Sequence, residues 1–154
     1  MNILFVCLGN ICRSPVAEAI FKHQIEKLGL SDHFFADSCG TANYHVGDNP
    51  DHRAIKNALK NGVEIHHKGR QITHADLEIF DLILAMDRHN LNSILKLSGA
   101  EKYFDKIKLM RFYDPISVGD VPDPYYGSEK DFQEVFEILD RSIQNLIQNQ
   151  LIKS

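Results

Sequence analysis

The segment Leu82–Met86 restricts most strongly how this chain can fold, because five apolar residues follow one another there without polar alternation. A strand that is apolar on both sides must be buried on both sides, as in a parallel sheet covered by helices. The run Ile3–Val6 near the amino terminus has the same character. Together the two runs predict a parallel sheet between two layers of helices.

Helix-like segments lie between the strand-like ones. Ser14 and Pro15 predict the N-cap and first turn of a helix that ends at Gly29. Apolar spacing predicts further helices over 50–62, after Thr73, over 91–95 and over 132–147. Two more strands are expected at 34–38 and 107–112, and turn-rich loops at 39–49 and 113–130.

Strand and helix alternate four times along the chain. This order predicts a doubly wound, three-layer α/β fold with a small, mostly four-stranded parallel sheet flanked by helices. The length of 154 residues fits a single domain over residues 1–154. Functional groups in such folds gather at the carboxyl ends of the strands. Three loops leave those ends: Cys7–Arg13, Cys39–Asn49 and Tyr113–Lys130.

Composition excludes some classes of function. The net charge of −4 gives no support for nucleic-acid binding. We expect no secretion signal, because no basic leader precedes the short run at 2–6, and no segment approaches the roughly 20 apolar residues of a membrane span. Three cysteines, an odd number, predict free thiols in a reducing cytoplasm. The oligomeric state stays open, with a monomer as one alternative.

The segment "VCLGNICRSP" (residues 6–15) gathers the chemically active side chains where a strand gives way to a helix. Backbone N–H groups in such a turn can point inward together, and the helix N-terminus adds partial positive charge. Arg13 adds a forked donor that suits two phosphate oxygens. Gly9 and Asn10 are suited to a tight or left-handed backbone. The segment therefore predicts an anion-binding loop formed by Leu8, Gly9, Asn10, Ile11, Cys12, Arg13 and Ser14.

Cys7 is expected at the base of this loop, where positive polarisation stabilises a thiolate nucleophile. The Ser14 hydroxyl can donate to the sulfur and assist its later departure. A buried cysteine at a strand end is also common as simple packing, so that alternative stays open on the pattern alone. The loop is not a nucleotide P-loop, since it has no Lys-Ser/Thr ending, and its single glycine excludes the dinucleotide fingerprint.

The chain resembles the low-molecular-weight protein tyrosine phosphatases nearly from end to end. Five motifs stand in the chain order of that family: "VCLGNICRSP", "ADSCGTANYHVGDNPDHRA", "GRQI", "FDLILAMD" and "VPDPYYG". The resemblance implies a flavodoxin-like fold of the phosphotyrosine protein phosphatase I type. It also implies hydrolysis of phosphotyrosine in protein substrates and of aryl phosphate monoesters, with inorganic phosphate as product.

Asp123 is the candidate general acid, because an attacked phosphate ester needs a proton for its leaving oxygen. It stands between Pro122 and Pro124, which restrict its backbone, and on local sequence alone a turn aspartate is the more usual interpretation. The resemblance implies the acid role, with Asp120 as the nearest competitor.

Several other residues are expected around the site. Tyr44, Tyr125 and Tyr126 would line a groove for an aromatic substrate ring. The resemblance implies that Ser38 and His67 hydrogen-bond Asn10 and hold its backbone, although a surface histidine is the plainer interpretation of His67. No cofactor and no metal are expected, because the histidines and cysteines lack metal-binding spacing.

Cys12 shares the curled loop with Cys7, so a reversible disulfide between them is one hypothesis, and simple packing is the other. Cys39 is expected only to pack. The function favoured is a protein-tyrosine phosphatase that acts through a phosphocysteine on Cys7, with Arg13 binding phosphate and Asp123 as general acid and base. The alternatives are a thiol-coupled arsenate reductase, for which the segment 80–86 offers no relay cysteine, and a non-catalytic phosphate-binding module.

Overall fold

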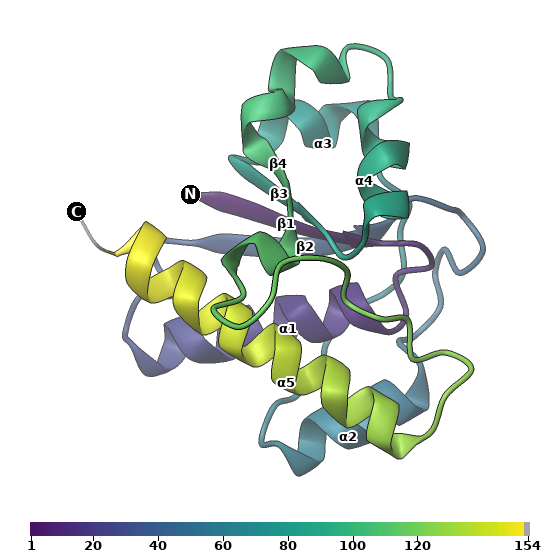
Figure 1. Cartoon of the computed structure of the whole chain (residues 1–154), viewed down its shortest axis with the longest axis vertical. Helices are drawn as coiled ribbons and strands as arrows, with labels where there is room; N and C mark the ends of the chain where they lie inside the picture. Colours follow the sequence, from purple (N-terminus) through teal and green to yellow (C-terminus); the bar gives the residue numbers. More distant parts are fainter. Residues whose placement is uncertain (153–154) are drawn as a thin grey trace.

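The computed structural model describes residues 1–152 and has helices on both sides of a parallel sheet (Figure 1). Among these residues, four strands form the sheet in the order β2-β1-β3-β4, and all paired neighbours are parallel. The strands are β1 (Asn2–Cys7), β2 (Phe35–Gly40), β3 (Leu82–Ala85) and β4 (Ile107–Leu109). The predicted α/β fold is therefore confirmed.

The helices pack in two layers. The α-helices are α1 (Arg13–Lys27), α2 (His52–Lys60), α3 (His74–Ile79), α4 (Arg88–Leu95) and α5 (Glu129–Leu146). Short 3-10 turns span Ala100–Lys106 and Met110–Tyr113, and a π turn spans Ile147–Leu151. In Figure 1, α1, α2 and α5 lie on one side of the sheet, and α3 and α4 lie on the other.

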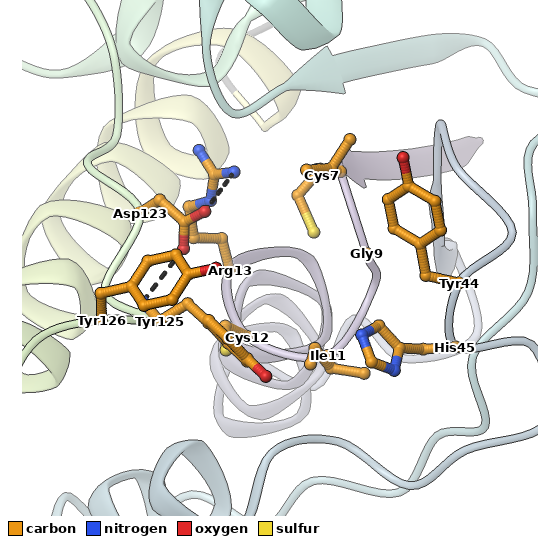
Figure 2. Close-up of a pocket in the computed structure, with 11 residues that line it drawn as sticks. Cys7, Gly9, Ile11, Cys12, Arg13, Tyr44, His45, Asp123, Tyr125 and Tyr126 are labelled. Atoms are coloured by element: carbon orange, nitrogen blue, oxygen red, sulfur yellow. Dashed lines mark hydrogen bonds and ion pairs between the residues drawn. The ribbon is translucent and has the colours of Figure 1, made fainter.

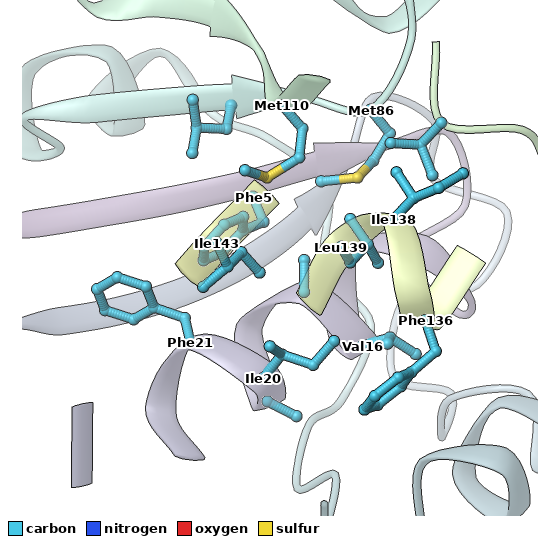
Figure 3. Packing of buried hydrophobic residues seen from close by; sticks show 14 of the residues in the cluster. Phe5, Val16, Ile20, Phe21, Met86, Met110, Phe136, Ile138, Leu139 and Ile143 are labelled. Carbon is cyan, nitrogen blue, oxygen red and sulfur yellow. The ribbon is translucent and has the colours of Figure 1, made fainter. Parts of the chain in front are cut away.

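The central strand β1 explains why the chain needs both layers. Its alternate residues Ile3 and Phe5 belong to the apolar cluster under α1 and α5, whereas Leu4 and Val6 belong to the cluster under α3 and α4. All four are fully buried. Figure 3 shows the larger cluster, in which the ring of Phe5 lies 5.9 Å from that of Phe21 on α1. Burial on both faces was the expectation for an unbroken apolar run.

Helix ends follow local chemistry, with one correction. Asp51 caps α2 by accepting from the N–H of Arg53, and Thr73 caps α3 in a reciprocal capping box with Asp76. The prediction that Ser14 caps the first helix is wrong, because α1 begins at Arg13 with Cys12 in the cap position. The Ser14 hydroxyl is occupied by partners in the loop instead.

Strand lengths differ from the prediction at two places. Strand β2 continues to Gly40 rather than ending at Ser38, since its pairing with β1 extends through Cys39 and Gly40. Strand β4 ends at Leu109 rather than Phe112, because the chain turns there into a 3-10 turn. The apolar residues that follow Leu109 lie in that turn, and Met110 is fully buried there.

Candidate functional site

The carboxyl ends of the strands bring together two segments that are distant in sequence. We call residues 7–14 the cysteine loop and residues 121–127 the aspartate loop. Together with Tyr44 and His45 they line a pocket of about 320 Å³. Figure 2 shows Cys7 and Arg13 between Tyr44 on one side and Asp123 and Tyr125 on the other. The pocket is thus built where the parallel sheet was expected to place it.

The cysteine loop curls around the sulfur of Cys7. Sγ lies 2.9 Å from the hydroxyl of Ser14 and accepts a 3.2 Å hydrogen bond from the backbone N–H of Asn10. Cys7 and Ser14 are both buried, at 3% and 0% exposure. The sulfur therefore sits at the floor of the pocket, with the N–H of Asn10 directed at it and the Ser14 hydroxyl within hydrogen-bond distance.

Asn10 holds the curl in place. Its φ of 59° lies in the left-handed region, and within residues 1–152 no other non-glycine residue has a positive φ. The side-chain amide donates to Ser14 (2.8 Å) and Ser38 (3.1 Å), and its oxygen lies 2.7 Å from Nε2 of His67. The expected contacts of Ser38 and His67 with Asn10 are therefore present.

Glu18, which the sequence analysis missed, supports this network from α1. Its carboxylate accepts from the Ser38 hydroxyl at 2.7 Å and lies 3.2 Å from Nδ1 of His67. Burial alone would raise the pKa of Glu18, but its hydrogen bonds with His67, Lys22 and Ser38 outweigh burial and lower the pKa. Nothing around position 18 in the sequence marked it, because a glutamate on a helix is ordinarily exposed.

A glycine is needed at position 9 because another side chain approaches its backbone closely, not because its φ is unusual. A Cβ atom there would lie 3.2 Å from Cδ2 of His45, so the imidazole packs directly on the loop. His45 also lies 3.1 Å from a carboxylate oxygen of Asp48. The sequence analysis did not select His45, although it is the direct neighbour of the predicted Tyr44.

Arg13 is buried and aimed by two partners beyond the loop. Its Nη1 donates to Asp87 at 2.7 Å and to the backbone oxygen of Val121 at 3.0 Å. Nη2 is thereby directed toward Asp123, whose Oδ2 lies 3.7 Å away. Burial lowers the pKa of Arg13, but the neighbouring Cys7, Asp87 and Asp123 more than compensate and raise it. A permanent positive charge therefore lies beside the sulfur.

Asp87 was missed as a site residue, although it ends the quoted motif "FDLILAMD". It caps α4 by accepting from the N–H of Asn90 at 2.7 Å, and Asn90 is 1% exposed. With its amide nitrogen toward Asp87, the Asn90 oxygen accepts from the N–H of Leu8 at 3.3 Å. Leu8 lines the pocket as expected, but its backbone N–H is therefore engaged by Asn90.

The aspartate loop is more open. The side chain of Asp123 is 48% exposed, and its Oδ1 accepts from the N–H of Tyr125 at 3.1 Å. Tyr125 is 39% exposed and Tyr126 is 96% exposed. Both tyrosines and Tyr44 border the pocket as expected. The competing carboxylate of Asp120 instead accepts from the N–H of Arg88, at 3.0 Å.

The cysteines are all free thiols. Burial, followed by the charges of Asp51 and Cys7, raises the pKa of Cys12, which keeps this thiol protonated near neutral pH. Burial likewise raises the pKa of Cys39, which is fully buried on β2. Cys39 packs in the cluster under α3 and α4, away from the pocket-lining residues.

One group in residues 1–152 has the composition of a metal site. Glu18, Asp37 and His67 place one ligand atom each within 4.8 Å of one another. These atoms already have partners, since His67 bridges the two carboxylates and Arg70 donates to Asp37 at 2.9 Å. They lie on the side of Asn10 that faces Ser38 and do not line the pocket. Within the same residues, no helix is both long and apolar enough to span a lipid bilayer.

Comparisons with known proteins agree with one another. The family model for low molecular weight phosphotyrosine protein phosphatase matches residues 2–154. The low molecular weight phosphotyrosine protein phosphatase of Rattus norvegicus is 43% identical over 137 residues, which cover 88% of this chain and 87% of the relative. The crystal structure of a protein tyrosine phosphatase from Entamoeba histolytica is 42% identical, with a TM-score of 0.92 over 96% of this chain and 94% of that one.

A more distant solved structure carries a different specificity. The arginine phosphatase YwlE of Bacillus subtilis is 29% identical, with a TM-score of 0.85 over 97% of this chain and 98% of that one. It was solved as a mutant with a phosphorylated active-site serine.

Proposed function

Because this chain belongs to the low molecular weight phosphotyrosine protein phosphatase family and is a hydrolase of that class, we propose that it hydrolyses phosphotyrosine through a phosphocysteine on Cys7. The observation that carries this proposal is the pocket in which Cys7, Arg13 and Asp123 meet. Residues 1–154 act as one phosphatase domain in this proposal, and its substrates are phosphoproteins.

The first step is attack of the Cys7 sulfur on phosphorus. The P–S bond forms as the bond from phosphorus to the phenolic oxygen breaks. Support comes from the N–H of Asn10 and the hydroxyl of Ser14, which lie 3.2 Å and 2.9 Å from the sulfur. Both stabilise the attacking thiolate, and Ser14 stabilises it again when the sulfur later leaves phosphorus. The phosphorylated serine in the YwlE mutant is consistent with transfer to this position of the fold.

Arg13 and the loop N–H groups hold the equatorial phosphoryl oxygens in the transition state. Asp87 and Val121 fix the guanidinium before substrate arrives, so little reorganisation is required. Two N–H groups of the loop have other partners: that of Asn10 donates to the Cys7 sulfur. That of Leu8 donates to Asn90 when the Asn90 amide nitrogen faces Asp87. With this positive charge in place, the mechanism requires no metal ion and no cofactor.

Asp123 donates its proton to the phenolic oxygen as that oxygen leaves. Water then attacks the phosphocysteine, with Asp123 as base, and inorganic phosphate departs with restoration of the thiolate. Because the reactive form combines a protonated Asp123 with an ionised Cys7, we expect the highest kcat/KM on the acid side of neutral pH. A rate that continued to rise above pH 8 would contradict this pairing.

Phosphotyrosine suits the shape of the pocket. Tyr44 and Tyr125 stand on opposite sides of the opening (Figure 2), where they can flank a substrate ring. Aryl phosphate monoesters present the same ring and phosphate and should also be hydrolysed.

The two alternatives have less support. Arsenate reduction coupled to thiols needs relay cysteines beyond those of the cysteine loop, but the segment 80–86 has none and Cys39 is fully buried on β2. A non-catalytic phosphate reader needs no proton donor, whereas the carboxylate of Asp123 lies 3.7 Å from Arg13 in the pocket wall.

Rapid quenching of turnover with p-nitrophenyl phosphate tests the proposal. Mass spectrometry should find one phosphoryl group on the peptide that contains Cys7, and Cys7→Ser should abolish turnover. Turnover without such an intermediate would refute the mechanism, and release of arsenite from arsenate with added thiol would favour the reductase.

We also propose redox control by a Cys7–Cys12 disulfide. Peroxide would oxidise the Cys7 thiolate to a sulfenic acid, and the Cys12 thiol would then displace water to form the disulfide. The buried, protonated Cys12 supports the view that oxidation begins at Cys7. Three free thiols fit the reducing cytoplasm proposed for the chain. Dithiothreitol should restore peroxide-treated enzyme, and equal recovery in Cys12→Ser would refute the disulfide.

A further inference from the structure

Arg53 connects the two loops of the site without lining the pocket. Its Nη2 donates to the backbone oxygen of Tyr125 at 2.9 Å. The same guanidinium donates to the carboxylate oxygens of Asp51, through Nε at 3.1 Å and Nη2 at 2.9 Å. Asp51 in turn donates its backbone N–H to the oxygen of Ile11 at 2.7 Å. A continuous chain of hydrogen bonds therefore runs from the cysteine loop to the aspartate loop.

The connection reaches the candidate acid itself. Tyr125, whose backbone oxygen Arg53 holds, donates its N–H to Oδ1 of Asp123 at 3.1 Å. The guanidinium carbon also lies 5.5 Å from the centre of the Tyr125 ring and 4.8 Å from that of Phe132, which adds cation–π attraction. Arg53 thus fixes both the backbone and the ring of the residue that orients Asp123.

Between the ends of the aspartate loop, Pro124 is buried, but few hydrogen bonds link the loop to the rest of the molecule. Val121 is buried and bonded to Met86 and Arg13, whereas Asp123 itself is half exposed. The contact between Asp123 and Arg13, at 3.7 Å, is an ion pair too long for a hydrogen bond. Arg53 supplies the bond that holds the middle of this loop to the rest of the molecule.

We propose that Arg53 is a positioning residue that holds Asp123 at the distance from Cys7 needed to protonate the leaving group. This inference rests on the proposed function, in which Asp123 is the general acid. Misplacing a general acid weakens proton transfer, so the effect depends on how much the leaving oxygen needs the proton. Phenolate, like the tyrosine oxygen, is strongly basic and needs it, whereas p-nitrophenolate is a much weaker base and needs it far less.

The test compares kcat/KM for phenyl phosphate and p-nitrophenyl phosphate at pH 5.5–6, since kcat/KM reports the first chemical step. Arg53→Ala should lower kcat/KM for phenyl phosphate roughly tenfold, a part of the ~10²–10⁴-fold that a general acid contributes. The loss for p-nitrophenyl phosphate should stay below about twofold. Arg53→Gln keeps part of the aliphatic stem but not the guanidinium, and it should show the same selective loss, even if Arg53→Ala folds poorly.

Lys56→Ala is the matched control, because Lys56 is also cationic and on α2 and is 65% exposed. Within residues 1–152 its salt-bridge partner is Glu129. It should leave both substrates unchanged. Equal losses for the two substrates in both Arg53 variants would overturn the proposal, because a merely structural role does not distinguish leaving groups.

A double-mutant cycle separates this inference from the function on which it rests. In an Asp123→Ala background, Arg53→Ala should cause no further selective loss, because the acid is already absent. A full additional loss would show that Arg53 acts through something other than Asp123. If Asp123→Ala itself showed no preference between the substrates, the acid assignment would fail and this inference with it.

Discussion

The cysteine loop and the aspartate loop face each other across one pocket but are built differently. In the cysteine loop, Asn10, Arg13 and Ser14 are at most 3% exposed, and each is bonded to buried or distant partners. In the aspartate loop, Asp123 is 48% exposed and Tyr126 is 96% exposed. The proposed anion site is buried and held by hydrogen bonds, whereas the proposed acid and ring-binding wall lie on an open, lightly anchored segment.

This difference matches the demands on the two sides. The phosphoryl group is the same in every substrate, so its site gains from rigidity. The rest of a phosphoprotein varies, and exposed tyrosines can adjust to it. The difference also makes the expected effects of mutation separable: changes in the cysteine loop should affect both stability and chemistry, and changes to the exposed residues of the aspartate loop should affect chemistry alone.

The largest effect is expected for Cys7→Ser. Loss of the thiolate should lower kcat for p-nitrophenyl phosphate by roughly 10⁴-fold or more, because the serine hydroxyl that replaces it is a much weaker nucleophile. Phosphate should still bind, since Arg13 and its partners are unchanged, and calorimetry can measure this. Substantial residual turnover would mean that another group carries the reaction.

Asp123→Ala should come next, with a loss of about 10²–10⁴-fold in kcat/KM for phenyl phosphate. Its free energy of unfolding should change by less than about 0.5 kcal/mol, because the side chain is half exposed. Asp120→Ala is the matched control and should retain activity. A larger loss in the Asp120 variant would exchange the two roles.

Asn10→Ala should combine both kinds of effect. Alanine at a φ of 59° is strained, and Ser14, Ser38 and His67 lose a partner, so we expect a destabilisation of about 2–4 kcal/mol. Asn10→Gly removes the strain but not the lost bonds, and its urea midpoint should lie between those of wild type and Asn10→Ala. Equal midpoints for the two variants would show that backbone strain is unimportant here.

Acid should weaken the segment before the aspartate loop through Asp114. Burial alone would raise the pKa of this carboxyl, but hydrogen bonds from Arg141, the N–H of Ile116 and Arg111 lower it to about 2. Because the folded-state pKa lies below the unfolded value of about 4, the ionised carboxylate stabilises the folded protein at pH values above about 4. This contribution of roughly 2 kcal/mol disappears as the pH falls toward 2. Urea midpoints between pH 5 and 2 should fall more steeply for wild type than for Asp114→Asn. Parallel slopes would contradict this assignment.

Tyr126→Ala should have the smallest effect. Its ring borders the pocket and is almost fully exposed, so we expect KM for a phosphotyrosyl peptide to rise about two- to fivefold, with kcat unchanged. Circular dichroism should show no loss of thermal stability. A large fall in kcat would mean that the open wall also takes part in the chemistry.

Sequence reasoning was sufficient for the fold because its signals were local. Apolar runs such as Leu82–Met86 and end signals such as Gly29 and Thr73 depend on neighbouring residues alone. The end of β4 was misplaced because Met110 is buried in a turn, and burial does not distinguish a turn from a strand. Ser14 looked like a cap, but its hydroxyl is bonded to Asn10 and lies beside Cys7 instead.

The site was predicted only where a residue's chemistry could be recognised from its motif. Arg13 and Asp123 were selected, whereas Asp87 and Arg53 were not, although both lie within quoted motifs. Glu18, on the same helix as Arg13, was not selected either. Their contacts join positions far apart along the chain, as in the bond between Arg53 and Tyr125, which are 72 residues apart. No periodicity or turn signal reports such a pairing, so only the folded arrangement makes these residues visible.

The positions of the Arg13 partners in the chain also determine when the site can form during synthesis. Asp87 and Val121 stand 74 and 108 positions further along the chain. The guanidinium therefore lacks these two hydrogen-bond partners until most of the polypeptide has left the ribosome. A nascent chain exposes its cysteine early and gains a working pocket late. Incomplete translation products ending before these positions would therefore be harmless to the phosphoproteins around them.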